Sequence, residues 1–98
     1  MKMASKSSRL AAVRGKIDRL DERLLRLINE RARLALAIGR IKRRKKWPVD
    51  DARREAFVLA HVQRVNRGPL SDYGVRKIFQ TILSRCRRRE RDGKPKRA

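Results

Sequence analysis

The stretch RLLRLINERARLALAIGRIK, residues 23–42, decides the fold of this chain. Its apolar residues are spaced alternately three and four positions apart, which is the pattern of one face of a long amphipathic helix. The whole series is Leu10, Val13, Ile17, Leu20, Leu24, Leu27, position 31, Leu34, Ile38 and Ile41. It predicts a helix over about residues 9–44, roughly 50 Å long at 1.5 Å per residue. Arg31 is the exception, because a charged residue stands where the series requires an apolar one.

Such a helix needs a partner, since the roughly 50 residues that follow it are too few to cover its length. The chain has 98 residues and a formal net charge of +20, from 30 Lys and Arg against 10 Asp and Glu. Cores of this size are marginal, and self-repulsion between like charges weakens a lone monomer further. Oligomerisation supplies the missing burial, and the simplest partner is a second copy of the chain.

Two shorter helices are predicted after the long one. Pro48 ends the first helix because it disfavours helical geometry at the residue before it. Asp50 or Asp51 can cap a second helix that runs to about Val65. A turn follows at residues 68–69, and Ser71 is a suitable N-cap for a third helix. The apolar stripes of these two helices are Val58, Leu59, Val62 and Val65, and then Val75, Ile78, Phe79, Ile82, Leu83 and Cys86. No strand pattern is present, so we predict an all-α fold with one long and two shorter helices.

The remaining composition limits the class of protein. We expect residues 1–8 and the basic tail 92–98 to be disordered, and residues 9–91 to form one domain. Cys86 is the only cysteine and His61 the only histidine, so we expect no internal disulfide and no metal site. No apolar run is long enough for a membrane span, and the first ten residues lack the apolar core of a secretory signal. We therefore expect a cytoplasmic protein.

Arg31 has two interpretations. A polar residue at one position of a helical seam can set its register. Alternatively the seam opens there into a pocket, in which the planar fork of the guanidinium binds a carboxylate. Lys42 lies three helical turns on, roughly 16 Å along the same face, and Gly39 between them would let a ligand approach. Arg14 is about 42 Å from Lys42 on one straight helix, so it can only serve the site of a paired, antiparallel chain.

Charged residues of the other two helices also share faces. Asp51, Arg54 and Glu55 fall together at the start of the second helix, where an acidic cap and an ion pair within the helix would explain them. On the third helix Glu90 lies one turn beyond Cys86. A solvated Glu90 among neighbouring arginines is the simpler interpretation of that position.

These segments together resemble the all-helical (AroQ-class) chorismate mutases over about residues 10–90. The matching segments are VRGKIDRLDERLLRLINERARLALAIGRIK, PVDDARREAFVL and GPLSDYGVRKIFQTIL. The resemblance implies an intertwined homodimer with two active sites. It also implies the cofactor-free rearrangement of chorismate to prephenate in phenylalanine and tyrosine biosynthesis.

The resemblance assigns roles to the charged residues. Arg31 would bind one substrate carboxylate, and Arg14 from the paired chain would bind the region of the second. Lys42 would donate to the ether oxygen, and Arg54 would support the anion nearby.

The remaining roles are for residues that line the pocket. Asp51 and Glu55 would line it, with Glu55 accepting a hydrogen bond from the ring hydroxyl. Cys86 stands where the family often has serine, and a thiol is a weaker donor. Glu90 stands where members have Gln or Glu, and it would donate to the ether oxygen only when protonated.

Three other interpretations remain. The basic runs RIKRRKK (40–46) and RCRRRER (85–91) are typical of nucleic-acid binding, but stacking aromatic residues are scarce and no nucleic-acid module is present. We therefore interpret the runs as solvated surface or as a field that steers a dianionic substrate. An isochorismate-pyruvate lyase has the same fold and anion clamp, although Asp51, Arg54, Glu55 and Glu90 favour the mutase. A poorly active mutase that needs another shikimate-pathway enzyme as partner is the third.

Overall fold

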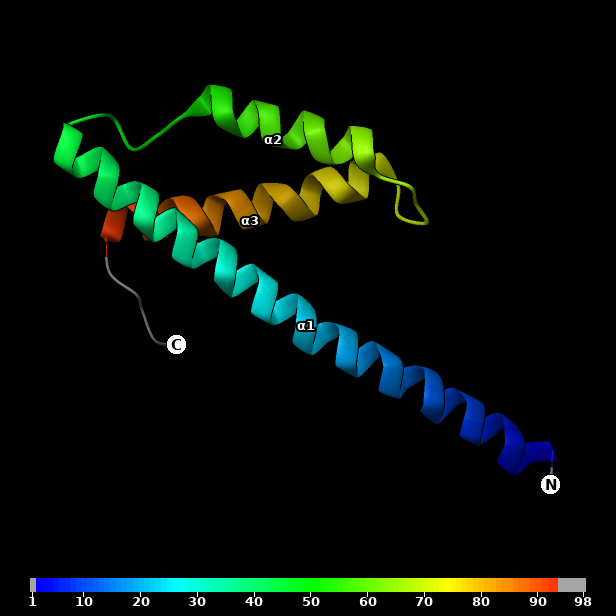
Figure 1. The fold of residues 1–98 in the computed structure, drawn as a ribbon. Coiled ribbons are helices and arrows are strands. Elements are labelled where there is room, and N and C mark those ends of the chain that lie inside the picture. The colour runs from blue at the N-terminus through cyan, green and yellow to red at the C-terminus, as the bar shows by residue number, and fades with distance from the viewer. Residues whose placement is uncertain (1, 94–98) are drawn as a thin grey trace. The chain divides into compact units, whose positions relative to one another are not determined.

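The computed structural model describes residues 2–93, with side chains from residue 7 onwards. These residues form three helices, α1 (Lys2–Lys45), α2 (Ala52–Val65) and α3 (Asp72–Asp92), and no strand (Figure 1). The prediction of an all-α chain with one long and two shorter helices is confirmed. Within the described residues, none of the helices is both long enough and apolar enough to cross a membrane.

The start of α1 corrects the sequence prediction. The helix begins at Lys2 and not near residue 9, so residues 2–8, which we expected to be disordered, are helical. The physical reason is that residues 2–8 contain neither Pro nor Gly, and their Lys, Met and Ala residues are strong helix formers. Asp92, which we expected to begin the disordered tail, is also helical and is the last residue of α3. Residue 1 and residues 94–98 lie outside the described part of the chain.

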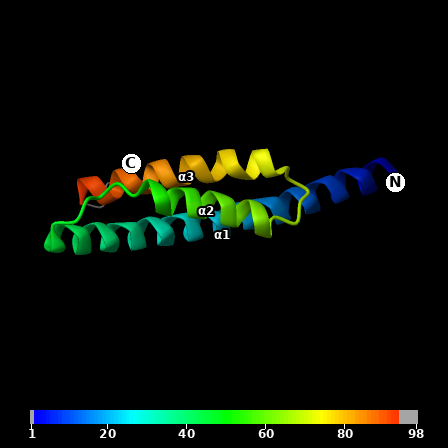
Figure 2. The ribbon, with the colours of Figure 1, turned by 90° about the horizontal axis from the view of Figure 1, so that it is seen from above.

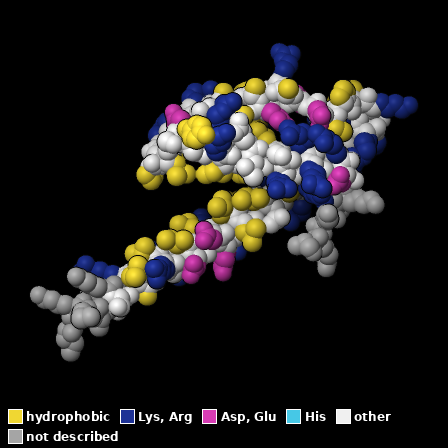
Figure 3. Space-filling view, turned by 180° about the vertical axis from the view of Figure 1, so that it is seen from behind, with side chains coloured by type: hydrophobic (Ala, Val, Ile, Leu, Met, Phe, Trp, Pro, Cys, Tyr) yellow, Lys and Arg dark blue, Asp and Glu magenta, His cyan; other side chains and the backbone are white. Residues whose placement is uncertain are grey.

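The chain divides into two compact units, residues 1–30 and residues 31–98. The first unit is the N-terminal part of α1, and its apolar stripe is exposed. The exposed fraction of these side chains ranges from 49% for Ile17 to 60% for Leu27. Figure 3 shows hydrophobic side chains following this helix. The unit therefore does not bury its own apolar seam.

The second unit contains the last part of α1 together with an antiparallel hairpin of α2 and α3 (Figure 2). Its core is a cluster of Val58, Leu59 and Leu83, against which Val62 and Phe79 pack. These residues belong to the apolar stripes predicted for the two shorter helices. The hairpin therefore forms by burying the two stripes against each other.

The helix ends are set by local hydrogen bonds. α1 ends in a Schellman motif, in which Lys46 adopts a φ of 58° and the N–H of Trp47 donates to the carbonyl of Lys42 at 2.8 Å. Asp51, one of the two predicted caps, accepts from the N–H of Arg54 at 3.0 Å and begins α2. Ser71 accepts from the N–H of Gly74 at 3.0 Å and begins α3, as predicted. The cap at Asp51 fixes the first turn of α2, which carries two of the predicted site residues.

Candidate active site

A cavity of about 440 Å³ lies in the second unit, between the last part of α1, the first turns of α2 and the last turns of α3. Seven of the eight predicted site residues line it, namely Arg31, Lys42, Asp51, Arg54, Glu55, Cys86 and Glu90. The eighth, Arg14, is exposed and belongs to the first unit. Residues from three helices that are up to 59 positions apart in sequence thus share one cavity.

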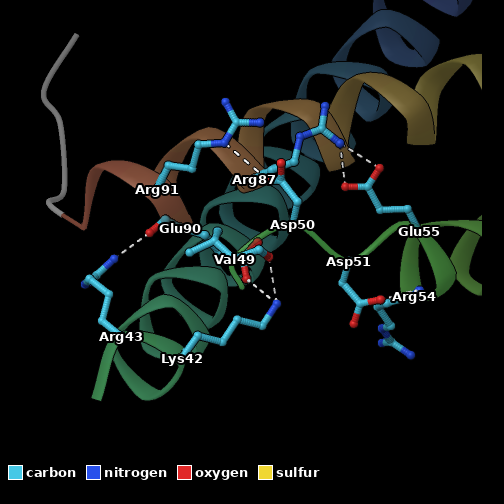
Figure 4. Close-up of polar contacts among 10 residues, drawn as sticks. All are labelled: Lys42, Arg43, Val49, Asp50, Asp51, Arg54, Glu55, Arg87, Glu90 and Arg91. Atoms are coloured by element: carbon cyan, nitrogen blue, oxygen red, sulfur yellow. Dashed lines mark hydrogen bonds and ion pairs between the residues drawn. The ribbon is translucent and has the colours of Figure 1, made fainter. Parts of the chain in front are cut away.

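Lys42 is fixed at one end of the cavity. Its Nζ donates to the backbone carbonyl of Val49 at 2.8 Å and lies 3.7 Å from Oε1 of Glu90 (Figure 4). Val49 belongs to the segment between α1 and α2, so this bond ties that segment to the last turns of α1. The Lys42 side chain is only 17% exposed. The ammonium is therefore held in place before any ligand arrives.

Glu90 faces Lys42 from α3, and its side chain is 15% exposed. Burial raises the pKa of the Glu90 carboxyl above its ordinary value, since the charged form loses solvation. Lys42 opposes this rise in pKa, while the carboxylates of Glu55 and Asp50 add to it. Glu90 is thus partly buried against a cation, which differs from the solvated side chain of the simpler interpretation.

Gly39 has a different role from the one we expected. A Cβ at this position would lie 2.7 Å from the carbonyl oxygen of Glu90 and 3.0 Å from its Cα. The space beside Gly39 is therefore filled by the α3 backbone and does not admit a ligand. The guanidinium of Arg43, one turn further along α1, donates to the same Glu90 carbonyl at 2.7 Å. The absence of a side chain at Gly39 lets α3 approach α1 closely enough to bring Glu90 beside Lys42.

Glu55 has a partner that sequence reasoning missed. Nη1 of Arg87 donates to both carboxylate oxygens of Glu55, at 2.6 and 2.5 Å, and Arg87 also lines the cavity (Figure 4). Arg87 lies inside an arginine-rich run, which hid it among solvated residues. One signal was present: Arg87 follows the buried Leu83 by four positions and precedes Glu90 by three, which puts it on the pocket side of the helix.

The remaining residues surround the cavity with mixed chemistry. Arg31 is half-buried, and within the described residues its side chain has no hydrogen bond or ion pair. Cys86 is 4% exposed and contributes an apolar wall. The guanidinium of Arg54 lies over the ring of Phe57, 5.3 Å from its centroid. The guanidinium of Arg31, which lines the cavity without a hydrogen bond or ion pair to the described residues, is therefore suited to bind a carboxylate.

The charges of the cavity favour an anion. Four cations line it, from Arg31, Lys42, Arg54 and Arg87, against three carboxyl groups, from Asp51, Glu55 and Glu90. The raised pKa of Glu90 shifts that balance further towards positive charge. The fold and this cavity therefore define an all-helical protein with a cation-rich pocket for a small anion.

The comparison with protein families gives the particular class. The family described as chorismate mutase type II matches residues 13–91, and the chain belongs to this family. The matched range contains every predicted site residue, including Arg14 of the first unit.

Individual proteins and solved structures that are similar to this chain support the same family assignment. The chain is 42% identical to a bifunctional chorismate mutase/prephenate dehydratase of Stutzerimonas stutzeri, over 84% of this chain and 24% of that protein. It is 33% identical to a chorismate mutase of Methanocaldococcus jannaschii, over 76% of this chain and 77% of that one. A solved chorismate mutase of Thermus thermophilus superimposes with a TM-score of 0.83 at 36% identity, covering 85% of this chain and 94% of that one. The chain spans about a quarter of the length of the bifunctional relative.

Proposed function

We propose that this chain catalyses the rearrangement of chorismate to prephenate, a step in the biosynthesis of phenylalanine and tyrosine. The observation that carries the proposal is the convergence of Arg31, Lys42, Glu55 and Glu90 on one cation-rich cavity in a chain of the chorismate mutase type II family. The reaction is intramolecular: an ether C–O bond breaks while a C–C bond forms in the same molecule. The protein therefore needs only to hold the reactive conformer and to stabilise its developing charge.

The dicarboxylate is held by cations. Arg31 binds one carboxylate, because its planar fork matches a carboxylate and no protein group within the described residues occupies it. Arg54 supports the same anion from the first turn of α2, whose position the Asp51 cap fixes. With Arg14 of the paired chain at the second carboxylate, both ends of the substrate are held, which favours the compact conformer in which the two reacting carbons are close.

The breaking ether oxygen is stabilised from the end of the cavity that holds Lys42 and Glu90. Negative charge grows on this oxygen as the bond breaks, and donors placed in advance lower the barrier. Lys42 supplies one donor. Glu90 supplies the second when it is protonated, and its raised pKa favours that form.

The active form is an intertwined, antiparallel homodimer in which Arg14 of one protomer completes the site of the other. The exposed apolar seam of the first unit supports this arrangement, because a second copy of the same seam would cover it. Arg14 lies beside this seam and is exposed. Prephenate is also named as a substrate of the bifunctional relatives, so a prephenate-consuming enzyme of the same pathway is a candidate partner.

One assay tests the proposal. Purified protein is incubated with chorismate and, separately, with isochorismate, and the formation of prephenate and of pyruvate is followed. We expect prephenate from chorismate, with Arg31→Met lowering kcat/KM by about 100-fold through the lost charged contact. The matched control is Arg33→Met, since Arg33 is exposed on the same helix and does not line the cavity. Pyruvate from isochorismate without prephenate from chorismate would assign the lyase instead.

A further inference from the structure

Arg87 and Glu55 form the ion pair that joins α3 to α2 at the cavity. A single nitrogen of Arg87, Nη1, donates to both oxygens of the carboxylate, so the direction in which the carboxylate points is constrained. The two side chains are 30% and 28% exposed. The pair between Arg91 of α3 and Asp50, which lies between α1 and α2, is 56% and 66% exposed. The Arg87–Glu55 pair is therefore less screened by solvent than an ordinary surface pair.

The contact leaves Glu55 able to accept further hydrogen bonds. An ionised carboxylate has about four acceptor positions on its two oxygens. Arg87 uses one position on each oxygen, so the others remain available to a donor inside the cavity that Glu55 lines. The donor-only guanidinium cannot itself accept a hydrogen bond, so Arg87 prepares an acceptor and does not compete with it.

The contact also balances charge. Glu55 lines a cavity that is proposed to receive a dianion, and an unpaired carboxylate there would repel it. Arg87 supplies a counter-charge from within the same cavity, and the hydrogen bond and charge of Glu55 raise the pKa of Arg87 in return. A carboxylate acceptor therefore coexists with a dianionic substrate because a cation is fixed against it.

We propose that Arg87 is a positioning residue that presents the Glu55 carboxylate to the ring hydroxyl of the substrate and thereby sets the selectivity of the site for a hydroxylated ring. This inference rests on the proposed function, and in particular on Glu55 accepting from that hydroxyl. Arg87 acts through Glu55 and does not bind the substrate carboxylates. Its removal therefore affects a substrate with the hydroxyl more than one without it.

The experiment compares two substrates, chorismate and its analogue lacking the ring hydroxyl, in wild type and in Arg87→Met, Arg87→Lys and Glu55→Gln. We expect Arg87→Met to lower kcat/KM for both dianionic substrates, because the charge of Glu55 is then uncovered. The loss should be about 10-fold larger for chorismate than for the deoxy analogue, since only chorismate also loses the hydrogen bond from its hydroxyl to Glu55. Arg87→Lys keeps the charge on a shorter side chain with a differently placed donor, so its activity should fall between that of wild type and that of Arg87→Met. The double variant Arg87→Met/Glu55→Gln should be no less active than Glu55→Gln alone.

Arg88→Met is the matched control, because Arg88 is exposed on the same helix and does not line the cavity. Equal losses with both substrates in Arg87→Met would overturn the inference, because Arg87 would then act only as a counter-charge to Glu55 or as a direct ligand of the substrate. Activity of Arg87→Met equal to that of Arg88→Met would also overturn it. If Arg87→Met does not fold, as judged by circular dichroism, Arg87→Lys decides by the same ratio between the two substrates. A folded wild type that turns over neither substrate would refute the proposed function, and the inference with it.

Discussion

Lys42 and Glu90 face each other across one end of the cavity, with 3.7 Å between Nζ and Oε1. The distance is longer than a hydrogen bond to a charged group normally is. Lys42 donates at 2.8 Å to Val49 instead, which leaves two of its three donors free for other acceptors. Both residues also line the cavity, so each faces the space that a ligand would occupy.

The protonation of Glu90 should control the pH dependence of the reaction. Its pKa is raised, chiefly by burial, so its neutral form persists to higher pH than that of an exposed glutamate. Only the neutral form donates, so kcat/KM should fall as pH rises through this pKa. Glu90→Gln has an amide donor at every pH and should remove that fall. The profile of kcat/KM against pH for the two proteins measures the difference.

A control separates this effect from general charge removal. Glu30→Gln removes the same charge from an exposed side chain of α1 that does not line the cavity, and its profile should follow wild type. If Glu90→Gln keeps the alkaline fall of wild type, then Glu90 is not the donor and another group titrates.

Gly39 should be sensitive to the smallest substitution. Gly39→Ala places a Cβ 2.7 Å from the carbonyl oxygen of Glu90, which is backbone and cannot rotate away. We expect α3 to shift, with a loss of about 1–3 kcal/mol in the free energy of unfolding. Glu90 would move away from Lys42, so kcat should fall as well. Urea denaturation and steady-state kinetics of the variant measure the two effects.

Gly15→Ala is the matched control on the same helix. A Cβ there would meet only the end of the Arg19 side chain, at 3.6 Å. Gly15 is also two residues away from both Val13 and Ile17, which places it on the face of the helix opposite these two residues of the apolar seam. The substitution should therefore stabilise the protein by about 0.5–1 kcal/mol, through the higher helix propensity of alanine. A Gly39→Ala variant as stable as Gly15→Ala would show that the contact with Glu90 relaxes without cost.

The sequence was sufficient to predict features that depend on a single helix. The spacing of apolar residues predicted α1 and its uncovered seam, and cap chemistry placed the starts of α2 and α3 at Asp51 and Ser71. It was insufficient to predict contacts that depend on how two helices pack against each other. Gly39 faces the Glu90 backbone only because α3 packs there. Arg87 lies on the pocket side of α3, but its role depends on Glu55 of α2 lying opposite, which the sequence of α3 does not show.

The proposed dimer makes a quantitative prediction for mixed variants. Arg14→Met and Arg31→Met should each be nearly inactive, because every site lacks one carboxylate ligand. In a heterodimer of the two, one site receives intact Arg31 from one protomer and intact Arg14 from the other. Random assembly makes half of the dimers mixed with one intact site each, so activity should recover to about one quarter of wild type.

The measurement is mutase activity after the two variants are denatured and refolded together, with each refolded alone as control. Recovery requires that Arg14 and Arg31 of one site come from different chains. If the mixture is no more active than the separate variants, Arg14 does not act across the dimer.

The exposed seam should be needed for both assembly and activity. Leu20 is 56% exposed in the single chain and lies in the middle of the seam. Leu20→Asp would place an unpaired charge in the proposed interface, which costs several kcal/mol and should weaken dimerisation by more than about 100-fold. Monomers would lack the Arg14 contribution, so activity should fall at protein concentrations below the new dissociation constant and recover above it.

Ala12→Asp introduces the same residue on the same helix at a position outside the seam, so it separates loss of the interface from loss of helix propensity. Ala12 is exposed and lies outside the seam. We expect this variant to sediment as wild type does and to keep its activity at all concentrations. Sedimentation velocity and specific activity are measured over the same dilution series. If Leu20→Asp behaves like Ala12→Asp in both, then the apolar seam of α1 is not the dimer interface, and the role of Arg14 needs a different partner surface.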